Sequence, residues 1–574
     1  MTRADALDAA AAEVRALQAR NRPDETPGTV EYPVDGGVTD HLRHWARERP
    51  GAVAIAFYGA EISYARYDEL SDRFAGWLLA CGARPGDRVG VYLGNCPQFL
   101  IAMMGILKAG CVHVPINPLF REHELRHELT DAGVSILLAQ DTFADLVETV
   151  RADTAVRRIA YTALTDLLDD RMRTDPVVPL PFPVQAERTD WASIVAVDPA
   201  PQRRDDPDAL AALNYTGGTT GMPKGCEHTQ RHMVYTAATA TVAGGRQPGT
   251  GDAVVLNFLP VFWIAGEDFG ILLPLVSGVP VVLLTRWDPE AVLALVARYG
   301  VTDMVGTVDN YVELMDLPGF EGVRTATLRN ALAVSFVLEL TPEIRSRWRA
   351  LVGGTLREAS YGMTETHTAD STTLGFQDGD RDLAADPVFC GLPVPGTDFL
   401  ILDEAGAPVP VGESGEIAVR SPSVLTAYYG RPDATAEVLR DGWLHTGDVG
   451  RLDEWGALHY LARTKEMIKT NGMSVFPSEV EALLRMHPDV VAVSVVPRPD
   501  PARGQVAYAF VQLGPGASTT ADGVREWARA NMAGYKVPDV ELVDGLPMTA
   551  TGKVRKGDLL ERAARAAAAA GERS

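Results

Sequence analysis

The spacing of apolar residues changes repeatedly along the chain from Val38 to about residue 360. Short continuous apolar runs, which predict buried strands, alternate with longer segments of helical period. Between Val38 and Gly133 this pattern predicts a helix, a hairpin about Tyr58 and Gly59, a second helix, and then a strand, a helix and a strand. A second run of the same kind spans residues 253–360. This βαβ alternation predicts two mixed α/β sheet subdomains.

The pattern differs in the last third of the chain. Short strands dominate residues 399–461, which predicts a small β subdomain, whereas two strands and a helix over 490–531 predict a compact α+β unit. The predicted fold class is therefore α/β, with a large N-terminal domain of two mixed α/β sheet subdomains plus a small β subdomain, followed by a mobile α+β C-terminal lid domain. We place the N-terminal core at residues 1–462 and the lid at 463–574. A chain of 574 residues is expected to form several domains, at roughly 150 residues each.

Charge and cysteine content argue against several classes of partner. With 53 basic and 76 acidic residues the formal net charge is −23, which disfavours non-specific binding to nucleic acid or to an anionic membrane. Five scattered cysteines without CxxC spacing indicate a reducing compartment, so the cytoplasm is the expected location. No apolar run reaches about 18 residues, and acidic residues interrupt the alanine-rich N-terminal segment. Neither a membrane span nor a signal peptide is therefore expected.

One short motif points to a different class of protein. His123, Glu124 and His127 form an HExxH pattern, in which two histidines on one helix face hold zinc and the glutamate acts as a base. No third ligand is evident nearby, and the flanking Arg121 and Glu128 indicate a solvated helix face. A metalloprotease is kept as an alternative.

The glycine-rich stretch from Tyr215 to Gly225, YTGGTTGMPKG, has the composition of a phosphate-binding loop. Its glycines let backbone amides approach an anion, its threonines add hydroxyl donors, and its lysine adds a mobile positive charge. A predicted strand at Ala209–Asn214 precedes it and a segment of helical period, His228–Val242, follows, as in a phosphate cradle. A Walker loop is excluded because glycine follows the lysine, and a flexible surface loop is the remaining alternative. The residues predicted to bind nucleotide here are Thr216, Gly217, Gly218, Thr219, Thr220 and Lys224.

Two further stretches carry groups suited to a nucleotide. In Tyr361–Glu365, YGMTE, Thr364 can donate a hydrogen bond to the α-phosphate and Glu365 can hold Mg²⁺ through its oxygens. In Gly442–Asp448, GWLHTGD, the carboxylate of Asp448 can accept hydrogen bonds from both ribose hydroxyls. An ordinary turn, or an aspartate that caps one, is the alternative in each case.

Together with Ala462–Glu481, ARTKEMIKTNGMSVFPSEVE, and Pro547–Lys556, PMTATGKVRK, these stretches resemble the motifs of the adenylate-forming superfamily of acyl-CoA synthetases, adenylation domains and luciferases. The matches stand in the order that the family has, and the resemblance covers nearly the whole chain from about Val38. The sequence departs from the family at Gly217, where serine is usual, and at Ala462, where glycine is usual.

The resemblance implies a role for each matched residue. Tyr361 would stack on the adenine, Arg463 would touch ribose or phosphate, and Lys465 would be the hinge of the lid. Lys553 would neutralise the charge that develops as the carboxylate oxygen of the acid attacks the α-phosphate and pyrophosphate leaves. Gly472 would pack against the tunnel of the thiol.

The family's reaction has two steps. ATP, with Mg²⁺, and a carboxylic acid or other small acid form an acyl-AMP, and the lid then rotates so that a thiol, commonly coenzyme A, displaces AMP. An alanine-rich helix follows the lid, so a carrier protein would be expected to act in trans. Two alternatives remain: ATP-dependent activation of an unusual acid such as nitrite, which a few relatives use to diazotise aromatic amines without coenzyme A, and a non-catalytic nucleotide-binding protein.

The acid is expected to bind between residues 259 and 339. Glu267 and Asp268 add carboxylates to this region, and the glycine turn that the family commonly has is missing from Ser335–Glu343. Extra carboxylates favour an amine-bearing or hydroxylated acid, aryl or polar, over an unbranched fatty chain. The predicted pocket residues are Trp263, Asp309 and Glu339.

Overall fold

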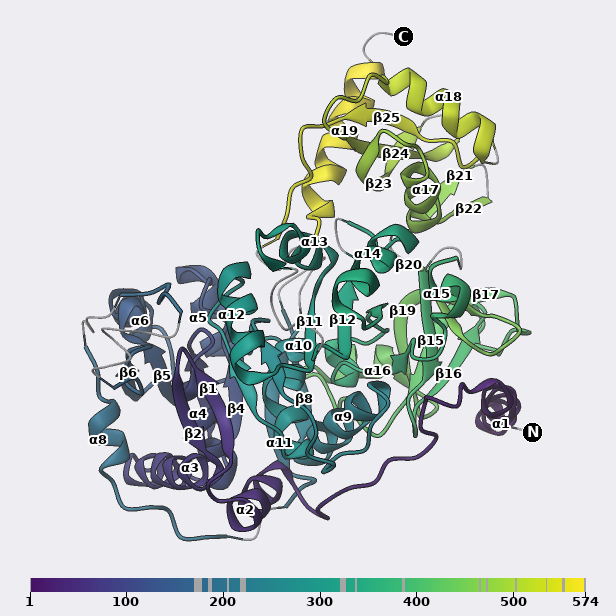
Figure 1. Ribbon diagram of the computed structural model, residues 1–574. Coiled ribbons are helices and arrows are strands. Elements are labelled where there is room, and N and C mark those ends of the chain that lie inside the picture. Colours follow the sequence, from purple (N-terminus) through teal and green to yellow (C-terminus); the bar gives the residue numbers. More distant parts are fainter. Residues whose placement is uncertain are drawn as a thin grey trace.

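The computed structural model describes residues 2–169, 178–183, 188–203, 206–216, 223–320, 327–335, 338–384, 388–463, 466–470, 473–500, 503–532, 534–549 and 553–571. Figure 1 shows a broad core built from three sheets, with a smaller C-terminal unit, the lid, above it. The N-terminus lies at one side of the core and the C-terminus at the far end of the lid. None of the described helices is both long and apolar enough to cross a membrane.

A six-stranded sheet forms the first α/β subdomain, with the strand order β6-β5-β3-β4-β7-β8. Neighbouring strands run parallel, except that β7 and β8 form an antiparallel hairpin. Helices cover the sheet, and its central strands are accordingly apolar and buried. The strands are β3 (Arg88–Tyr92), β4 (Val112–Pro115), β5 (Ile136–Gln140), β6 (Arg158–Thr162), β7 (Leu210–Tyr215) and β8 (Gly225–Thr229).

A seven-stranded sheet forms the second α/β subdomain, in the order β13-β12-β11-β9-β10-β1-β2. The hairpin expected about Tyr58 and Gly59 is present. Its first strand, β1, pairs in parallel with β10, so the hairpin adds two strands to a sheet whose other strands come from residues 253–360. The strands are β1 (Val53–Phe57), β2 (Ala60–Ser63), β9 (Val255–Asn257), β10 (Val281–Leu283), β11 (Asp303–Thr307), β12 (Asn330–Val334) and β13 (Leu356–Glu358).

Helices fill the space on and between these two sheets (Figure 1). α4 is buried along its whole length, and the ammonium of its last residue, Lys108, lies 2.5 Å from Asp68 and 2.7 Å from Asp72. A buried cation requires such partners. The helices of the core are α1 (Arg3–Asn21), α2 (Val38–Glu48), α3 (Tyr64–Ala80), α4 (Pro97–Lys108), α5 (Glu122–Asp131), α6 (Ala144–Arg151), α8 (Trp191–Val195), α9 (Gln230–Ala243), α10 (Ile264–Glu267), α11 (Leu273–Ser277), α12 (Pro289–Tyr299), α13 (Val308–Asp316), α14 (Pro342–Val352), α15 (Arg381–Ala384) and α16 (Pro432–Val438).

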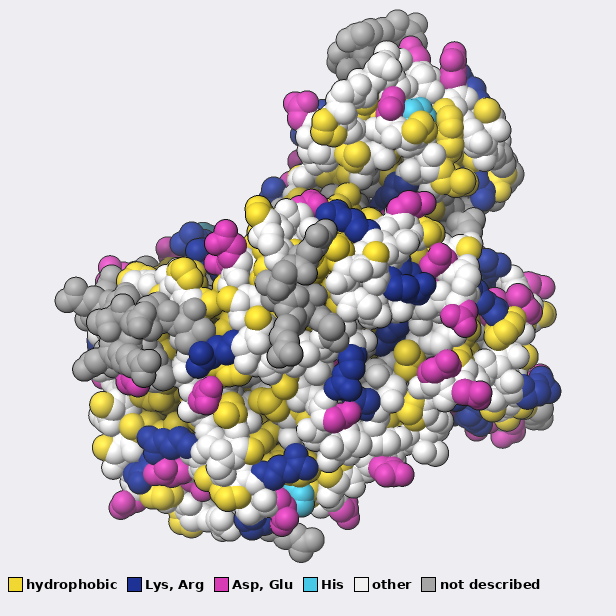
Figure 2. Space-filling view, viewed as in Figure 1, with side chains coloured by type: hydrophobic (Ala, Val, Ile, Leu, Met, Phe, Trp, Pro, Cys, Tyr) yellow, Lys and Arg dark blue, Asp and Glu magenta, His cyan; other side chains and the backbone are white. Residues whose placement is uncertain are grey.

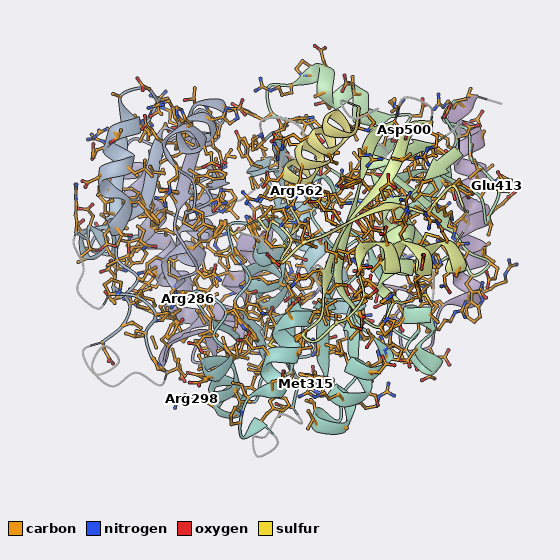
Figure 3. The ribbon with its side chains drawn as sticks, turned by 90° about the horizontal axis from the view of Figure 1, so that it is seen from above. Arg286, Arg298, Met315, Glu413, Asp500 and Arg562 are labelled. Carbon is orange, nitrogen blue, oxygen red and sulfur yellow. The ribbon has the colours of Figure 1, made fainter. Side chains whose placement is uncertain are left out.

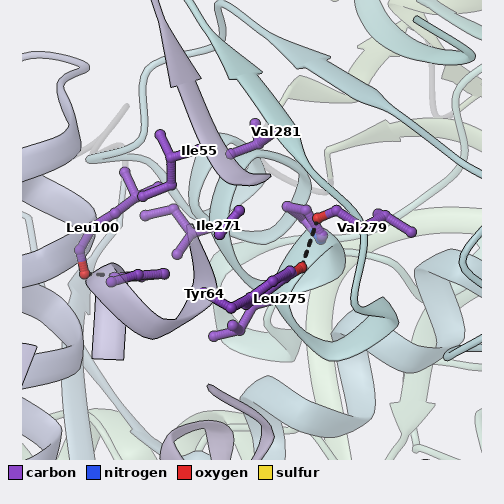
Figure 4. A pocket seen from close by; sticks show the side chains of 10 residues that line it. Ile55, Tyr64, Leu100, Ile271, Leu275, Val279 and Val281 are labelled. Carbon is purple, nitrogen blue, oxygen red and sulfur yellow. Dashed lines mark hydrogen bonds between the residues drawn. The ribbon is translucent and has the colours of Figure 1, made fainter. Parts of the chain in front are cut away.

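A small cavity of about 10 Å³ lies between β1, α3 and α11 (Figure 4). The Tyr64 hydroxyl beside it donates a hydrogen bond of 3.1 Å to the carbonyl of Val279. A volume of this size holds about one water molecule. The cavity is therefore a packing defect of the core and not a substrate site.

The small β subdomain is an antiparallel sheet in the order β14-β15-β20-β19-β17-β16, with β18 beside β19. Helix α1 covers part of it: Leu7 and Ala11 pack against Leu400, Leu402 and Trp443. The strands are β14 (Ser371–Thr372), β15 (Val388–Pro393), β16 (Asp398–Leu402), β17 (Ser414–Arg420), β18 (Leu439–Arg440), β19 (Trp443–Leu452) and β20 (Leu458–Arg463).

The lid has a hydrophobic core of its own, in which Leu484 of α17 and Val524 of α18 pack against strands of a five-stranded sheet. Viewed from above, Arg562 and Asp500 of the lid lie in front of the core (Figure 3), and in Figure 2 the lid is a separate mass joined to the top of the core. The lid elements are β21 (Ile468–Thr470), β22 (Met473–Val475), α17 (Pro477–Arg485), β23 (Val490–Asp500), β24 (Gly504–Leu513), α18 (Ala521–Asn531), β25 (Asp539–Leu542) and α19 (Lys556–Gly571).

The predicted fold class is confirmed: two mixed α/β sheets, a small β subdomain and an α+β C-terminal unit. The domain boundary after residue 462 and the movement of the lid stay predictions. All five cysteines are free thiols, as expected.

Candidate nucleotide and acid site

The glycine-rich stretch is the turn of the β7–β8 hairpin. At its neck the amide of Thr216 donates to the carbonyl of Lys224 at 3.0 Å, and the amide of Lys224 donates to the Thr216 hydroxyl at 3.2 Å. The two ends of the loop are thus fixed together, and both residues are half-buried. Four further predicted loop residues lie outside the described part of the chain: Gly217, Gly218, Thr219 and Thr220.

The segment after the loop differs from the sequence prediction. A helix was expected from His228, whereas Gly225–Thr229 form strand β8 and helix α9 begins only at Gln230. The hydroxyl of Thr229 caps the helix by accepting from the amide of His232. The start of α9 therefore lies one strand away from the loop in the sequence. β8 is only five residues long, too short to show a strand period of its own, so the sequence pattern places the end of β8 in the helix that follows.

Tyr428 joins the loop to the predicted magnesium ligand. The ammonium of Lys224 lies 4.5 Å from the centre of the Tyr428 ring, and the Tyr428 hydroxyl donates to Oε1 of Glu365 at 2.7 Å. The amide of Tyr429 also donates to the carbonyl of Gly225 at 2.8 Å. Segments more than 60 residues apart in sequence thus meet at one place. Sequence reasoning missed Tyr428, because it stands in a loop without a recognisable spacing.

These residues fit the needs of a magnesium nucleotide. Mg²⁺ is usually held by one or two carboxylates together with substrate phosphates, rather than by a cage of protein ligands. Glu365 is half-buried and supplies one carboxylate, and the described residues contain no group of three or more His, Cys, Asp or Glu side chains placed around a metal. Glu365 would hold the ion, which would draw negative charge from the phosphates.

A second polar group surrounds Asp448, the predicted ribose ligand. Its Oδ2 accepts a 2.6 Å hydrogen bond from the Tyr361 hydroxyl, and its Oδ1 lies 2.8 Å from Nε of Arg463. Burial raises the pKa of Asp448, while Arg463 and the Tyr361 hydrogen bond oppose that shift. Tyr361, Asp448 and Arg463 are therefore brought together, as their predicted roles at adenine and ribose require.

The lid places Lys553 close to this group. Burial and the positive charge of Arg463 both lower the pKa of the Lys553 ammonium, although the residue as a whole is exposed. Its loop is closed by hydrogen bonds between Lys553 and Thr549, at 3.0 Å for the amide to the Thr549 hydroxyl. Lys556, at the start of α19, lies 2.8 Å from Glu466. The predicted hinge Lys465 and the predicted tunnel residue Gly472 lie outside the described residues.

The predicted acid-pocket residues occupy different surroundings. Trp263 is half-buried and meets Phe262 edge to face at 5.5 Å. Asp309 accepts a long hydrogen bond of 3.5 Å from the amide of Leu338. Glu339 forms an ion pair with Arg485 of the lid, so its carboxylate faces the lid and already has a partner. A role for these residues in acid binding stays a prediction.

Glu267 and Asp268 are fully buried, so they do not point to solvent. Glu267 accepts a 3.0 Å hydrogen bond from the side-chain amide of Asn214, and its other oxygen lies 3.9 Å from Nε2 of His367. Burial raises the pKa of Glu267 to about 8 and that of Asp268 well above its ordinary value. The Glu267 carboxyl is accordingly protonated at neutral pH.

Replacing Glu267 by glutamine should make the protein more stable at alkaline pH. The folded-state pKa of about 8 lies above the ordinary value of 4.5, so the neutral carboxyl favours folding below 4.5, and this contribution is lost as pH rises toward 8. A neutral amide avoids the loss. We expect a gain of about 1–3 kcal/mol over the wild type at alkaline pH and little difference at pH 4.5, the ordinary pKa of the group. Thermal unfolding in both buffers checks this, and parallel pH dependences of the two proteins would contradict it.

The HExxH residues do not form a zinc site. They lie at the start of α5, where Glu124 accepts the amide of Arg121 at 3.0 Å and so caps the helix. His123 and Glu124 are exposed. No His, Cys, Asp or Glu cluster of ligand geometry includes them in the described part of the chain. The metalloprotease alternative is therefore not supported.

The chain is similar to known proteins over nearly its whole length. The sequence model of the AMP-binding enzyme family matches residues 42–429, and that of the AMP-binding enzyme C-terminal domain matches 479–553. The chain is 32% identical to a long-chain-fatty-acid–CoA ligase of Bacillus subtilis (strain 168), over 94% of this chain and 98% of the relative. It is 34% identical to a feruloyl-CoA synthase of an Amycolatopsis species, over 90% and 97%. The crystal structure of ATP-bound MatB from Rhodopseudomonas palustris superposes with a TM-score of 0.79 at 27% identity, covering 92% of this chain and 99% of that one.

The fold and these relatives define the chain as an AMP-forming ligase with a large core and a smaller C-terminal unit. The chain belongs to the AMP-binding enzyme family, the adenylate-forming superfamily that the motifs resemble.

Proposed function

We propose that the protein activates a carboxylic acid with ATP as an acyl-AMP, releases pyrophosphate, and transfers the acyl group to coenzyme A. The observation that carries the proposal is that two polar groups, one of Lys224, Tyr428 and Glu365 and one of Asp448, Arg463 and Lys553, lie close together, because the carboxylates of Asp448 and Glu365 both raise the pKa of Arg463. Together they offer positive charge for phosphates, a carboxylate for Mg²⁺ and a carboxylate for ribose. The acyl-CoA ligases among its relatives support the same reaction class.

For the acid we propose an aryl or other polar acid. Phe262 and Trp263 are half-buried and meet edge to face just before α10, which suits a flat ring. The amide and the hydroxyl of Ser335 donate hydrogen bonds of 2.9 and 2.7 Å to the carboxylate of Glu358. These bonds fix the first residue of Ser335–Glu343, the segment that lacks the family's glycines. One of the relatives is named a feruloyl-CoA synthase, which acts on an aromatic acid.

The test is ATP–pyrophosphate exchange with a panel of acids. The panel contains hydroxycinnamates, aminobenzoates, unbranched alkyl acids of several lengths and nitrite, with a no-acid control. We expect exchange to depend on an added acid, to be fastest with an aryl acid, and to be followed by acyl-CoA formation when coenzyme A is supplied. Exchange without any acid would overturn acid activation. A clear preference for unbranched alkyl acids would overturn the aryl assignment, and exchange with nitrite alone would favour diazotisation.

A further inference from the structure

The turn that carries Thr364 and Glu365 is held in a strained conformation. It is a single 3₁₀ turn, Thr364–Thr366, followed by His367 at φ 59° and Thr368 at φ 88°, two consecutive non-glycine residues in the left-handed region. Each such residue costs about 1–3 kcal/mol and persists only where the surroundings impose it. The position of Glu365 therefore depends on contacts from outside the turn.

Three contacts from other segments hold the backbone carbonyls of the turn. The carbonyl of Glu365 accepts the amide of Leu425 at 2.7 Å, and that of His367 accepts the Thr236 hydroxyl at 2.7 Å. The carbonyl of Thr364 accepts Nε2 of His228 at 2.8 Å. Of these three contacts, the one from His228 is made to Thr364, the residue that is expected to touch the α-phosphate.

The geometry also fixes the tautomer of His228. A carbonyl only accepts, so Nε2 of His228 carries the proton, and its Nδ1, which lies 3.3 Å from Nδ1 of His232, is unprotonated in the neutral ring. His228 is fully buried, which lowers its pKa well below the ordinary value and keeps the ring neutral. The ring of His367 packs edge-on against it, with centroids 4.7 Å apart. His228 is thus a fixed, neutral donor at the end of β8.

We propose that His228 is a positioning residue for adenylation: by donating to the Thr364 carbonyl it holds the strained turn so that Thr364 and Glu365 face the nucleotide. This inference rests on the proposed function, because it takes the roles of Thr364 and Glu365 from it. His228 lies on β8, the short strand that follows the phosphate loop. The β7–β8 hairpin therefore both carries the loop and holds the turn of Thr364 and Glu365.

The test compares His228→Leu, which removes the donor, with His228→Gln, whose amide nitrogen reaches a similar position. His41→Leu is the matched control, because His41 on α2 is equally buried and its Nδ1 lies 3.0 Å from a backbone carbonyl, that of Gly37 just before the helix. We expect His228→Leu to raise KM for MgATP and lower exchange by about tenfold or more, as misplaced groups do. His228→Gln should recover to within about threefold of the wild type. His41→Leu should lower Tm and leave KM unchanged.

The outcomes separate this inference from the function it rests on. The proposed function fails if the wild type shows no acid-dependent exchange. Glu365→Gln serves as the reference for the turn: if that variant keeps full exchange while the wild type is active, the role of Glu365 fails, and the positioning role of His228 fails with it. If Glu365→Gln is inactive but His228→Leu keeps the wild-type KM, the positioning role fails. The role also fails if His228→Gln is as impaired as His228→Leu, or if His41→Leu raises KM as much, because the effect would then be general destabilisation.

Discussion

Replacing Lys553 by alanine is expected to lower acid-dependent ATP–pyrophosphate exchange by about two to three orders of magnitude. Burial and the charge of Arg463, which pairs with Asp448, lower the pKa of the Lys553 ammonium, so in this lid orientation the lysine lies near the proposed ribose ligand. Loss of the lysine's charge removes stabilisation that is needed only as pyrophosphate leaves. KM for ATP should change much less than kcat. Exchange rates at saturating ATP and acid provide the measurement.

Two controls make the Lys553 result specific. Lys536→Ala removes another lysine of the lid, one that lies 5.9 Å from the Tyr535 ring, and should leave exchange unchanged. Supplied acyl-AMP should still react with coenzyme A in the Lys553→Ala protein, because that step no longer needs charge on the α-phosphate to be neutralised. Equal exchange in wild type and Lys553→Ala would refute the assigned role.

The second large effect is expected at Glu365. Glu365→Gln keeps the shape and can still accept from the Tyr428 hydroxyl, but it removes the negative charge proposed to hold Mg²⁺. We expect exchange to fall by about a hundredfold or more, and the Mg²⁺ concentration for half-maximal rate to rise. A magnesium titration of the exchange rate gives both values. Tyr428→Phe, which removes only the hydrogen bond, is the matched control and should lose much less. An unchanged magnesium dependence in Glu365→Gln would exclude Glu365 as the ligand.

The sequence predicted those helices, strands and hairpins that depend on the local spacing of apolar residues. The β1–β2 hairpin follows from a turn at Tyr58 and Gly59, and the structure places both residues at positive φ. The partner of that hairpin was not predictable, because β10 lies more than 200 residues further along and no local pattern specifies a parallel neighbour. Not every short strand was predictable from the sequence. The end of β8 was assigned to the following helix, because a five-residue strand is too short to show a clear alternation of apolar and polar residues.

The candidate site also contains residues that local motifs identify and residues that they do not. Asp448, Arg463 and Tyr361 could be proposed from motifs, and the structure brings them into direct contact. Tyr428 and His228 could not, because each acts through one long-range contact, to Glu365 and to the Thr364 carbonyl, and neither has a spacing that marks it.

Helix α1 has a consequence for how the chain is made. Arg15 bonds to Asp398, 383 residues away, and Gln18 bonds to the carbonyl of Gly456, 438 residues away. At about 5–20 residues per second a ribosome needs on the order of 20–90 s to produce that distant surface. Helix α1 is therefore synthesised well before the surface on which it docks, and until that surface forms Leu7 and Ala11 remain uncovered, which makes this helix a target for chaperones that shield apolar segments.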